Sequence, residues 1–159
     1  MRQLNKLHLL HRIYLQRAAV NNGLYNGQPP LLEYVEKHPG CTQAELADFL
    51  KVSPPCIATS VKRLQKAGII TKTEDASDMR RSHLYLTPLG QTKSEQCRQA
   101  ADQIDKQIFN GFTSEETECF YSMLDRMLAN LSIDEFAGKS FGALMQTAKE
   151  LEKKEPEQN

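Results

Sequence analysis

The 159-residue sequence contains no tryptophan, has only 7% aromatic residues and carries no net charge, since 20 basic side chains balance 20 acidic ones. It also has no apolar run near the length of about 18 residues that a membrane-spanning helix needs. His8, His11 and Arg12 interrupt the N-terminal stretch and leave no apolar core for a secretory signal. We therefore expect one domain that works in the cytoplasm and does not enter a membrane.

Motifs for metal, cofactor and catalytic chemistry are also missing. The four cysteines do not form a CxxC pair, and the four histidines do not form an HExxH pattern. Neither GxGxxG nor the phosphate-loop pattern GxxxxGK is present. These absences predict a protein that is not an enzyme and needs neither metal nor cofactor.

Charge is distributed unevenly along the chain although it sums to zero. Residues 1–50 carry a net charge of +1, residues 51–93 carry +5, and residues 94–159 carry −6. A basic middle segment is typical of a region that meets a polyanion, but uneven solvation of helix faces gives the same pattern. Charge alone leaves both interpretations open.

Two short helices are predicted between residues 42 and 68. Thr42 and Glu45 form a capping box at the start of the first helix. Ser53 is the expected N-cap of the second, and Pro54 stands at its first position, where a missing N–H costs nothing. Gly68 ends the second helix in the place usual for a left-handed residue. Two such helices joined by about four residues have the dimensions of a helix-turn-helix.

A β-hairpin follows the second helix. Residues 69–73 and 82–87 predict two strands, joined by a polar tip over residues 74–81. Further helices are expected to be capped by Thr87, by Thr113 with Glu116 and by Ser132 with Glu135, the last one reaching about residue 152. The predicted fold is therefore mainly α with a small β-hairpin wing, a winged helix-turn-helix.

Three stretches carry a family resemblance: Gln43-Ala44-Glu45-Leu46-Ala47, the run Arg63-Leu64-Gln65-Lys66-Ala67-Gly68-Ile69-Ile70, and Asp78-Met79-Arg80 followed by Leu84-Tyr85-Leu86-Thr87-Pro88-Leu89-Gly90. Together they resemble the MarR-type winged-helix transcription regulators, the multiple antibiotic resistance family. The resemblance implies an N-terminal dimerisation helix over 1–22, a DNA-binding region over 23–90 and C-terminal dimerisation helices over 91–152. The tail over 153–159 is expected to be disordered.

The resemblance implies a sequence-specific transcription regulator, more precisely a repressor that a small effector releases from DNA. Its second helix would enter the major groove, and Arg80, oriented by Asp78, would enter the minor groove. The candidate DNA-binding residues are Ser53, Pro54, Pro55, Thr59, Ser60, Lys62, Arg63, Lys66, Asp78, Arg80 and Arg81.

Two positions depart from the family pattern. Lys51 stands in the turn where many relatives have glycine, which predicts a non-glycine residue at positive φ. Thr59 stands where many relatives have arginine in the middle of the recognition helix, so the operator sequence does not follow from the resemblance.

Wide apolar surfaces on the first and last helices agree with the homodimer that the family implies. Such a dimer would read two half-sites of a pseudo-palindromic operator in double-stranded DNA, about 34–36 Å apart. His8, His11 and Tyr14 are candidates for binding a small aromatic or phenolic effector, as family members do.

Two alternative functions remain open at this point. One is a winged-helix module that binds a protein and no operator. The other is a regulator that senses oxidants through Cys56, because the N-terminal dipole of its helix favours a thiolate.

Overall fold

The computed structural model describes residues 1–25, 27–74, 82–139 and 141–152. Asp78, Arg80 and Arg81 of the wing tip, and the tail over 153–159, lie outside the described residues. The chain divides into two compact units, Met1–Ile108 and Phe109–Asn159, and each is described by itself.

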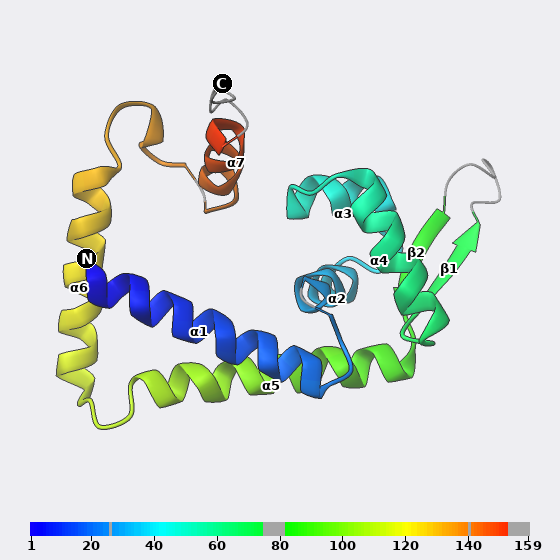
Figure 1. Cartoon of the computed structure of the whole chain (residues 1–159), viewed down its shortest axis with the longest axis horizontal. Coiled ribbons are helices and arrows are strands. Elements are labelled where there is room, and N and C mark those ends of the chain that lie inside the picture. Colours follow the sequence, from blue (N-terminus) through cyan, green and yellow to red (C-terminus); the bar gives the residue numbers. More distant parts are fainter. Residues whose placement is uncertain (26, 75–81, 140, 153–159) are drawn as a thin grey trace, which may run out of the picture. The chain divides into compact units, whose positions relative to one another are not determined.

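The first unit contains, in chain order, α1 (Arg2–Asn21), α2 (Gln28–Lys37), α3 (Gln43–Leu50), α4 (Pro54–Lys66), β1 (Ile70–Glu74), β2 (Ser82–Leu86) and α5 (Pro88–Ile108) (Figure 1). The second unit contains α6 (Ser114–Leu131), a 3-10 turn (Asp134–Phe136) and α7 (Phe141–Glu152). The order confirms the predicted fold class, a mainly helical chain with a two-stranded antiparallel wing.

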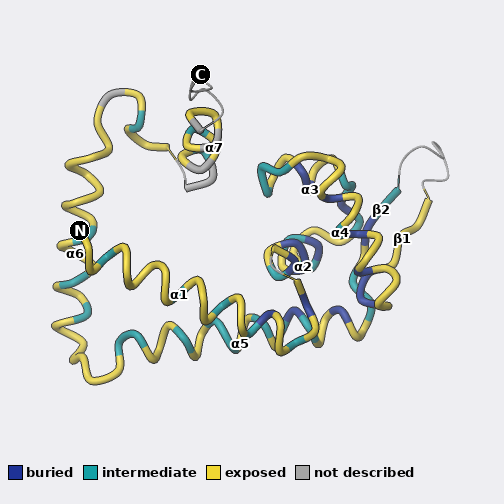
Figure 2. Tube along the Cα trace, in the orientation of Figure 1, coloured by how far each residue is buried: buried dark blue, intermediate teal, exposed yellow. Residues whose placement is uncertain are grey.

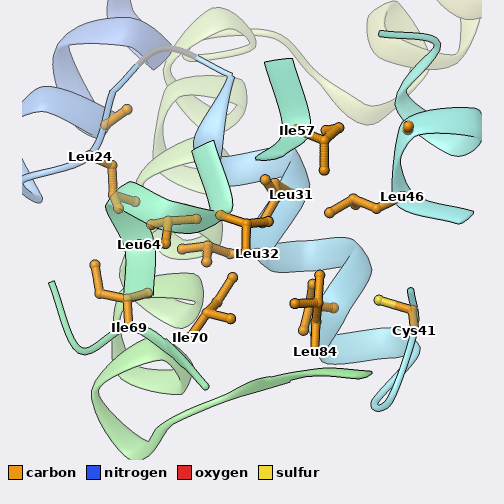
Figure 3. Close-up of a cluster of buried hydrophobic side chains, with 14 residues drawn as sticks. Leu24, Leu31, Leu32, Cys41, Leu46, Ile57, Leu64, Ile69, Ile70 and Leu84 are labelled. Atoms are coloured by element: carbon orange, nitrogen blue, oxygen red, sulfur yellow. The ribbon is translucent and has the colours of Figure 1, made fainter. Parts of the chain in front are cut away.

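The hydrophobic core lies where α2, α3, α4 and the hairpin meet. Side chains from each of these elements are at most 2% exposed and point toward one another, among them Leu32, Leu46, Ile57, Leu64 and Leu84 (Figure 3). Burying an aliphatic side chain of this size contributes about 1.5–3 kcal/mol. Figure 2 shows that the buried residues of the first unit gather in this region and along the adjoining part of α5. α4 therefore packs against the core with one side, and its other side is exposed.

The hairpin is extended by a third short segment that the sequence did not predict. In the ladder, Ile70 is opposite Leu86 and Lys72 is opposite Leu84. On the other side of β2, Gly40 N donates to Leu84 O at 2.8 Å and Leu84 N donates to Cys41 O at 2.9 Å. These two bonds attach the connection between α2 and α3 to the wing.

The junction between the hairpin and α5 gives a physical reason for the Leu-Thr-Pro-Leu-Gly motif. Thr87 Oγ1 donates to Gly68 O at 2.6 Å and accepts from Gly90 N at 3.1 Å. A Cβ at Gly90 would lie only 2.1 Å from Ile69 O. Glycine is therefore required for the first turn of α5 to pack against the end of the α4 to β1 connection.

Helix ends confirm part of the predicted capping. Thr42 and Thr113 each accept from the backbone N–H three residues later, and the glutamate there accepts from the threonine N–H, so both capping boxes are present. Ser53 is at the N-cap position with extended backbone, but the predicted side-chain cap is wrong, because its hydroxyl makes no capping hydrogen bond.

The predicted start of the last helix, directly after Ser132, is also wrong. A 3-10 turn over Asp134–Phe136 takes the place of its first turn, and α7 begins only at Phe141. Gly138, at φ +70°, has a left-handed backbone that a continuous helix cannot include.

The second unit has few buried side chains of its own. No residue of α6 is buried, and Tyr121, Met123, Leu128 and Leu131 are each more than half exposed. An aromatic group of Phe109, Phe112, Phe120 and Tyr121 is held by edge and tilted contacts. This apolar surface exceeds what the unit covers by itself.

Candidate nucleic-acid interface

The two short helices form a helix-turn-helix around a left-handed residue. Lys51 has φ +51° and ψ +45°, which confirms the positive φ expected where many relatives have glycine. Its ammonium group donates to Asp48 Oδ1 at 2.9 Å, and Val52 N donates to Ala47 O at 3.2 Å. These local bonds hold a conformation that is unfavourable for a side chain other than glycine or asparagine.

One side of α4 is buried and the other is exposed. Ile57, Val61 and Leu64 face the core, as their spacing predicts. The exposed side carries the polar and basic side chains that were candidates for DNA contact. We name this side the recognition face: Pro55, Thr59, Lys62, Arg63 and Lys66, all exposed.

The recognition face has the electrostatic character that a polyanion needs. Lys62, Arg63 and Lys66 add three positive charges, and α4 contains no acidic residue. Ser53 and Pro54 are exposed at the start of the helix, while Ser60 is half-buried. The structure therefore brings the candidates of residues 53–66 together on one helix.

Thr59 occupies the centre of the recognition face. Its hydroxyl donates to Pro55 O at 2.9 Å, so the donor is used within the helix. The methyl group and the oxygen lone pairs remain for a partner. A threonine methyl can contact the methyl group of thymine in a major groove, and the oxygen can accept from a base amino group.

Arg63 has an aromatic partner that the sequence analysis missed. Its guanidinium carbon lies 5.2 Å from the centroid of the Tyr25 ring, over the ring face. Tyr25 belongs to the connection between α1 and α2, 38 positions before Arg63 in the sequence. A contact over that separation depends on the tertiary fold, so no local pattern predicts it.

The strands of the wing are described up to Glu74 and from Ser82 onward. His83 on β2 is half-buried, and its Nδ1 is 2.7 Å from Gly40 O. This contact connects the wing strand to the same segment that Leu84 pairs with. The wing strand β2 is thus fixed to the connection that leads into α3.

The three candidate effector residues, His8, His11 and Tyr14, lie along α1. His11 Nε2 is 3.1 Å from Asp105 Oδ1 of α5, whereas His8 and Tyr14 are exposed. A cavity of about 540 Å³ opens instead nearer the end of α1, among α1, α2 and α5. His8, His11 and Tyr14 do not line this cavity.

The cavity combines apolar walls with a few charged groups. Leu15, Ala19, Pro30, Cys97 and Ala101 supply apolar surface, and Arg12, Glu33, Arg98 and Asp102 supply charge. Burial raises the pKa of the Cys97 thiol, which favours its protonated form.

A polar contact beside the cavity links α2 to α5. Glu36 Oε2 accepts from Ser94 Oγ at 2.8 Å and from Arg98 at 3.2 Å, and Arg98 also pairs with Glu95. Ser94 is only 5% exposed. Glu36 therefore binds one buried partner, Ser94, and one exposed partner, Arg98.

The other cysteines differ in environment. Cys56 is exposed in the first turn of α4 and Cys119 is exposed on α6, while Cys41 is buried. Burial, with a smaller effect of Glu45, raises the pKa of the Cys41 thiol to about 11. Among the described residues, no three His, Cys, Asp or Glu side chains are placed to hold a metal ion.

These features define a winged helix-turn-helix: a short helix, a tight turn, a second helix with a basic exposed face, and a hairpin fixed beside it. In the described part of the chain, none of the helices has the length and apolar character needed to cross a membrane.

Comparisons with known proteins assign the family. A sequence model of the MarR family matches residues 22–81. The uncharacterized HTH-type transcriptional regulator YybA of Bacillus subtilis is 30% identical over 111 residues, covering 70% of this chain and 74% of YybA. The chain belongs to the MarR family of HTH-type, DNA-binding transcription regulators, which are not enzymes.

Solved structures show the same fold. MarR is 26% identical with a TM-score of 0.65, over 81% of this chain and 88% of MarR. A mutant of S. aureus MepR bound to an oligodeoxyribonucleotide is 23% identical with a TM-score of 0.67, over 82% of this chain and 96% of MepR.

Proposed function

We propose that this regulator binds a specific operator through the recognition face of α4 and represses transcription in the cytoplasm. The observation that carries the proposal is the composition of that face, which has three positive charges and no acidic side chain. Lys62 and Lys66 supply affinity through phosphates, and Thr59 and Arg63 reach toward base edges or phosphates. Ser53, Pro54, Pro55 and Ser60 complete the proposed contact surface.

The wing supplies the second contact in this proposal. Arg80 enters the minor groove, where the negative potential attracts a guanidinium group, while Asp78 orients it and Arg81 binds phosphate. An Arg80→Ala variant should lower operator affinity by about 1–3 kcal/mol and leave the subunits associated. Unchanged affinity would remove Arg80 from the contact surface.

We further propose a homodimer built by α1, α6 and α7. The exposed apolar side chains of α6 support it, because a monomer would leave Met123, Leu128 and Leu131 in water. Two copies would present two α4 helices to half-sites about 34–36 Å apart, which requires a pseudo-palindromic operator.

Release by a small aromatic or phenolic effector is the proposed regulation, with the cavity as its site. The cavity supports this because its walls come from α1 and α5 on one side and from α2 of the DNA-binding region on the other. A ligand bound there changes the position of α2 relative to α1 and α5 and thereby the spacing of the recognition helices. His8, His11 and Tyr14 are a second candidate site, on α1 outside this cavity.

A cavity-filling variant tests the effector site separately from DNA binding. Ala101→Phe places a ring in the cavity, so the variant should bind DNA but respond less than the wild type to benzoate or phenol. His8→Ala is the matched control for the other candidate site. An equal response of Ala101→Phe and the wild type would contradict the cavity assignment.

The central experiment is selection of fragmented genomic DNA by the purified protein at two salt concentrations, followed by sequencing. A pseudo-palindrome should be enriched, and log K should fall linearly with log salt, by about 0.9 for each phosphate neutralised. Arg63→Ala should weaken binding, whereas Lys106→Ala removes the same charge from α5 and should not. If the protein retains DNA fragments but enriches no sequence, operator recognition is contradicted. If it retains no DNA at either salt concentration, the protein-interaction alternative is favoured.

A redox function is the second candidate, because Cys56 is exposed in the first turn of the proposed recognition helix. Peroxide should then abolish DNA binding of the wild type and spare Cys56→Ser. Equal loss in both proteins would contradict the redox function.

A further inference from the structure

The connection between α1 and α2 presents an exposed tyrosine between two buried anchors. Leu24 and Gln28 are each 3% exposed, whereas Tyr25 is 62% exposed. Tyr25 N donates to Gln28 Oε1 at 2.8 Å, and Gln28 N donates to Tyr25 O at 3.1 Å. Gln28 thus binds both polar groups of the Tyr25 backbone, the N–H through its buried side-chain oxygen and the carbonyl through its own backbone N–H, so the backbone that carries this exposed ring is fixed by the fold.

The ring faces the guanidinium of Arg63, at 5.2 Å from centroid to guanidinium carbon. This distance is within the range of a cation–π contact, in which the ring face attracts the positive charge. In the described part of the chain, no carboxylate lies within ion-pair distance of Arg63. The tyrosine ring is therefore the partner that sets the direction of this side chain.

An aromatic partner suits an arginine that must bind DNA. The ring contacts the face of the guanidinium, while its five N–H donors lie in the plane and point outward. A carboxylate would occupy those donors and would repel phosphate. Holding the long side chain before binding also reduces the conformational entropy that it loses on the DNA.

We propose that Tyr25 is a positioning residue for DNA recognition: its ring holds the Arg63 guanidinium so that the donors face the operator. The proposal rests on the proposed DNA-binding function of α4. It adds the α1 to α2 connection to a recognition surface that otherwise consists of α4 and the wing.

The test compares Tyr25→Leu, Tyr25→Phe, Arg63→Ala and the double variant Tyr25→Leu/Arg63→Ala, using fluorescence anisotropy on the DNA fragment that the wild type selects. Tyr25→Leu should weaken binding about two- to fivefold per subunit, the typical range for an exposed cation–π contact. Tyr25→Phe keeps the ring and should bind within twofold of the wild type. In the Arg63→Ala background, Tyr25→Leu should have no further effect.

Salt dependence separates positioning from a change in charge. Arg63→Ala removes a phosphate-binding charge and should reduce the slope of log K against log salt by about 1 for each arginine lost from a phosphate. Tyr25→Leu leaves the charge in place and should keep the wild-type slope while the affinity falls. A side-chain NMR spectrum of the free protein should show a ring-current shift on the Arg63 protons that Tyr25→Leu abolishes and Tyr25→Phe retains.

Three outcomes would overturn the proposal. Wild-type affinity in Tyr25→Leu, with Arg63→Ala weakened, refutes the positioning role but leaves the DNA-binding function standing. Equal losses in Tyr25→Phe and Tyr25→Leu assign the effect to the hydroxyl group. A wild type that selects no fragment refutes the proposed function, and the role of Tyr25 on DNA with it.

Discussion

Replacing Gly90 with alanine tests the packing that joins the winged region to α5. A Cβ on Gly90 would lie 2.1 Å from Ile69 O, and real Cβ atoms essentially never approach a heavy atom closer than 3.0 Å. The two segments must therefore separate by about 0.9 Å, the difference between these distances. Because the contacted atom belongs to the backbone, no change of rotamer relieves the clash.

The expected loss of stability follows from three contributions. Forced packing costs about 1–3 kcal/mol. Separation also weakens the bonds from Thr87 to Gly68 O and Ile69 O, which together contribute about 1–2 kcal/mol. Alanine recovers about 1 kcal/mol of helix propensity relative to glycine. We expect the free energy of unfolding to fall by about 1–4 kcal/mol.

Urea denaturation followed by far-ultraviolet circular dichroism measures this change. All variants are compared at one protein concentration, because the stability of an oligomer depends on it. Gln91→Ala is the matched control, since it changes the next, exposed residue of the same helical turn. A Gly90→Ala protein as stable as the wild type, or more stable, would refute the reasoning, because it would show that helix propensity outweighs the clash.

Three further predictions concern caps and thiols. Thr42→Ala should lower the free energy of unfolding by about 1 kcal/mol, whereas Ser53→Ala should lower it less because Ser53 makes no capping bond. Urea denaturation measures both variants, and equal losses would contradict the assignment of Thr42 as the stronger cap. Iodoacetamide at neutral pH should alkylate exposed Cys56 well before buried Cys41, as mass spectrometry would show; equal rates would contradict the burial of Cys41. Because the folded chain keeps the Cys41 proton up to a pKa of about 11 against a usual 9.0, stability should fall as pH rises through this range, and Cys41→Ala should show a smaller fall.

Local chemistry made much of this fold predictable. The two capping boxes use contacts only three residues apart, and Gly68 at φ +68° ends α4 as its position predicts. The spacing of Ile57, Val61 and Leu64 was sufficient to identify the buried side of α4. These features need no knowledge of the tertiary structure, since each is decided within one or two helical turns.

Features that depend on distant parts of the chain were not predictable. The pairing of Cys41 with Leu84 and the contact of Tyr25 with Arg63 join segments with no shared local pattern. The cavity was missed for the same reason, because its walls come from three helices that are separate in the sequence. Even within one segment, the start of α7 was misplaced, since a capping pattern at Ser132 competes with the left-handed Gly138.

In the proposed regulation, a small ligand in the cavity acts on a distant DNA contact through the start of α2. Pro29 and Pro30, which line it, lie in the first turn of α2, and Gly27 lines it within the connection that contains Tyr25. The polar contact from Glu36 to Ser94 and Arg98 links the same helix, α2, to α5 farther along. A ligand that moves the start of α2 must therefore strain this link or displace the Tyr25 connection. If a ligand in the cavity weakens DNA binding, as proposed, thermodynamic linkage requires that DNA weaken the binding of that ligand by the same factor.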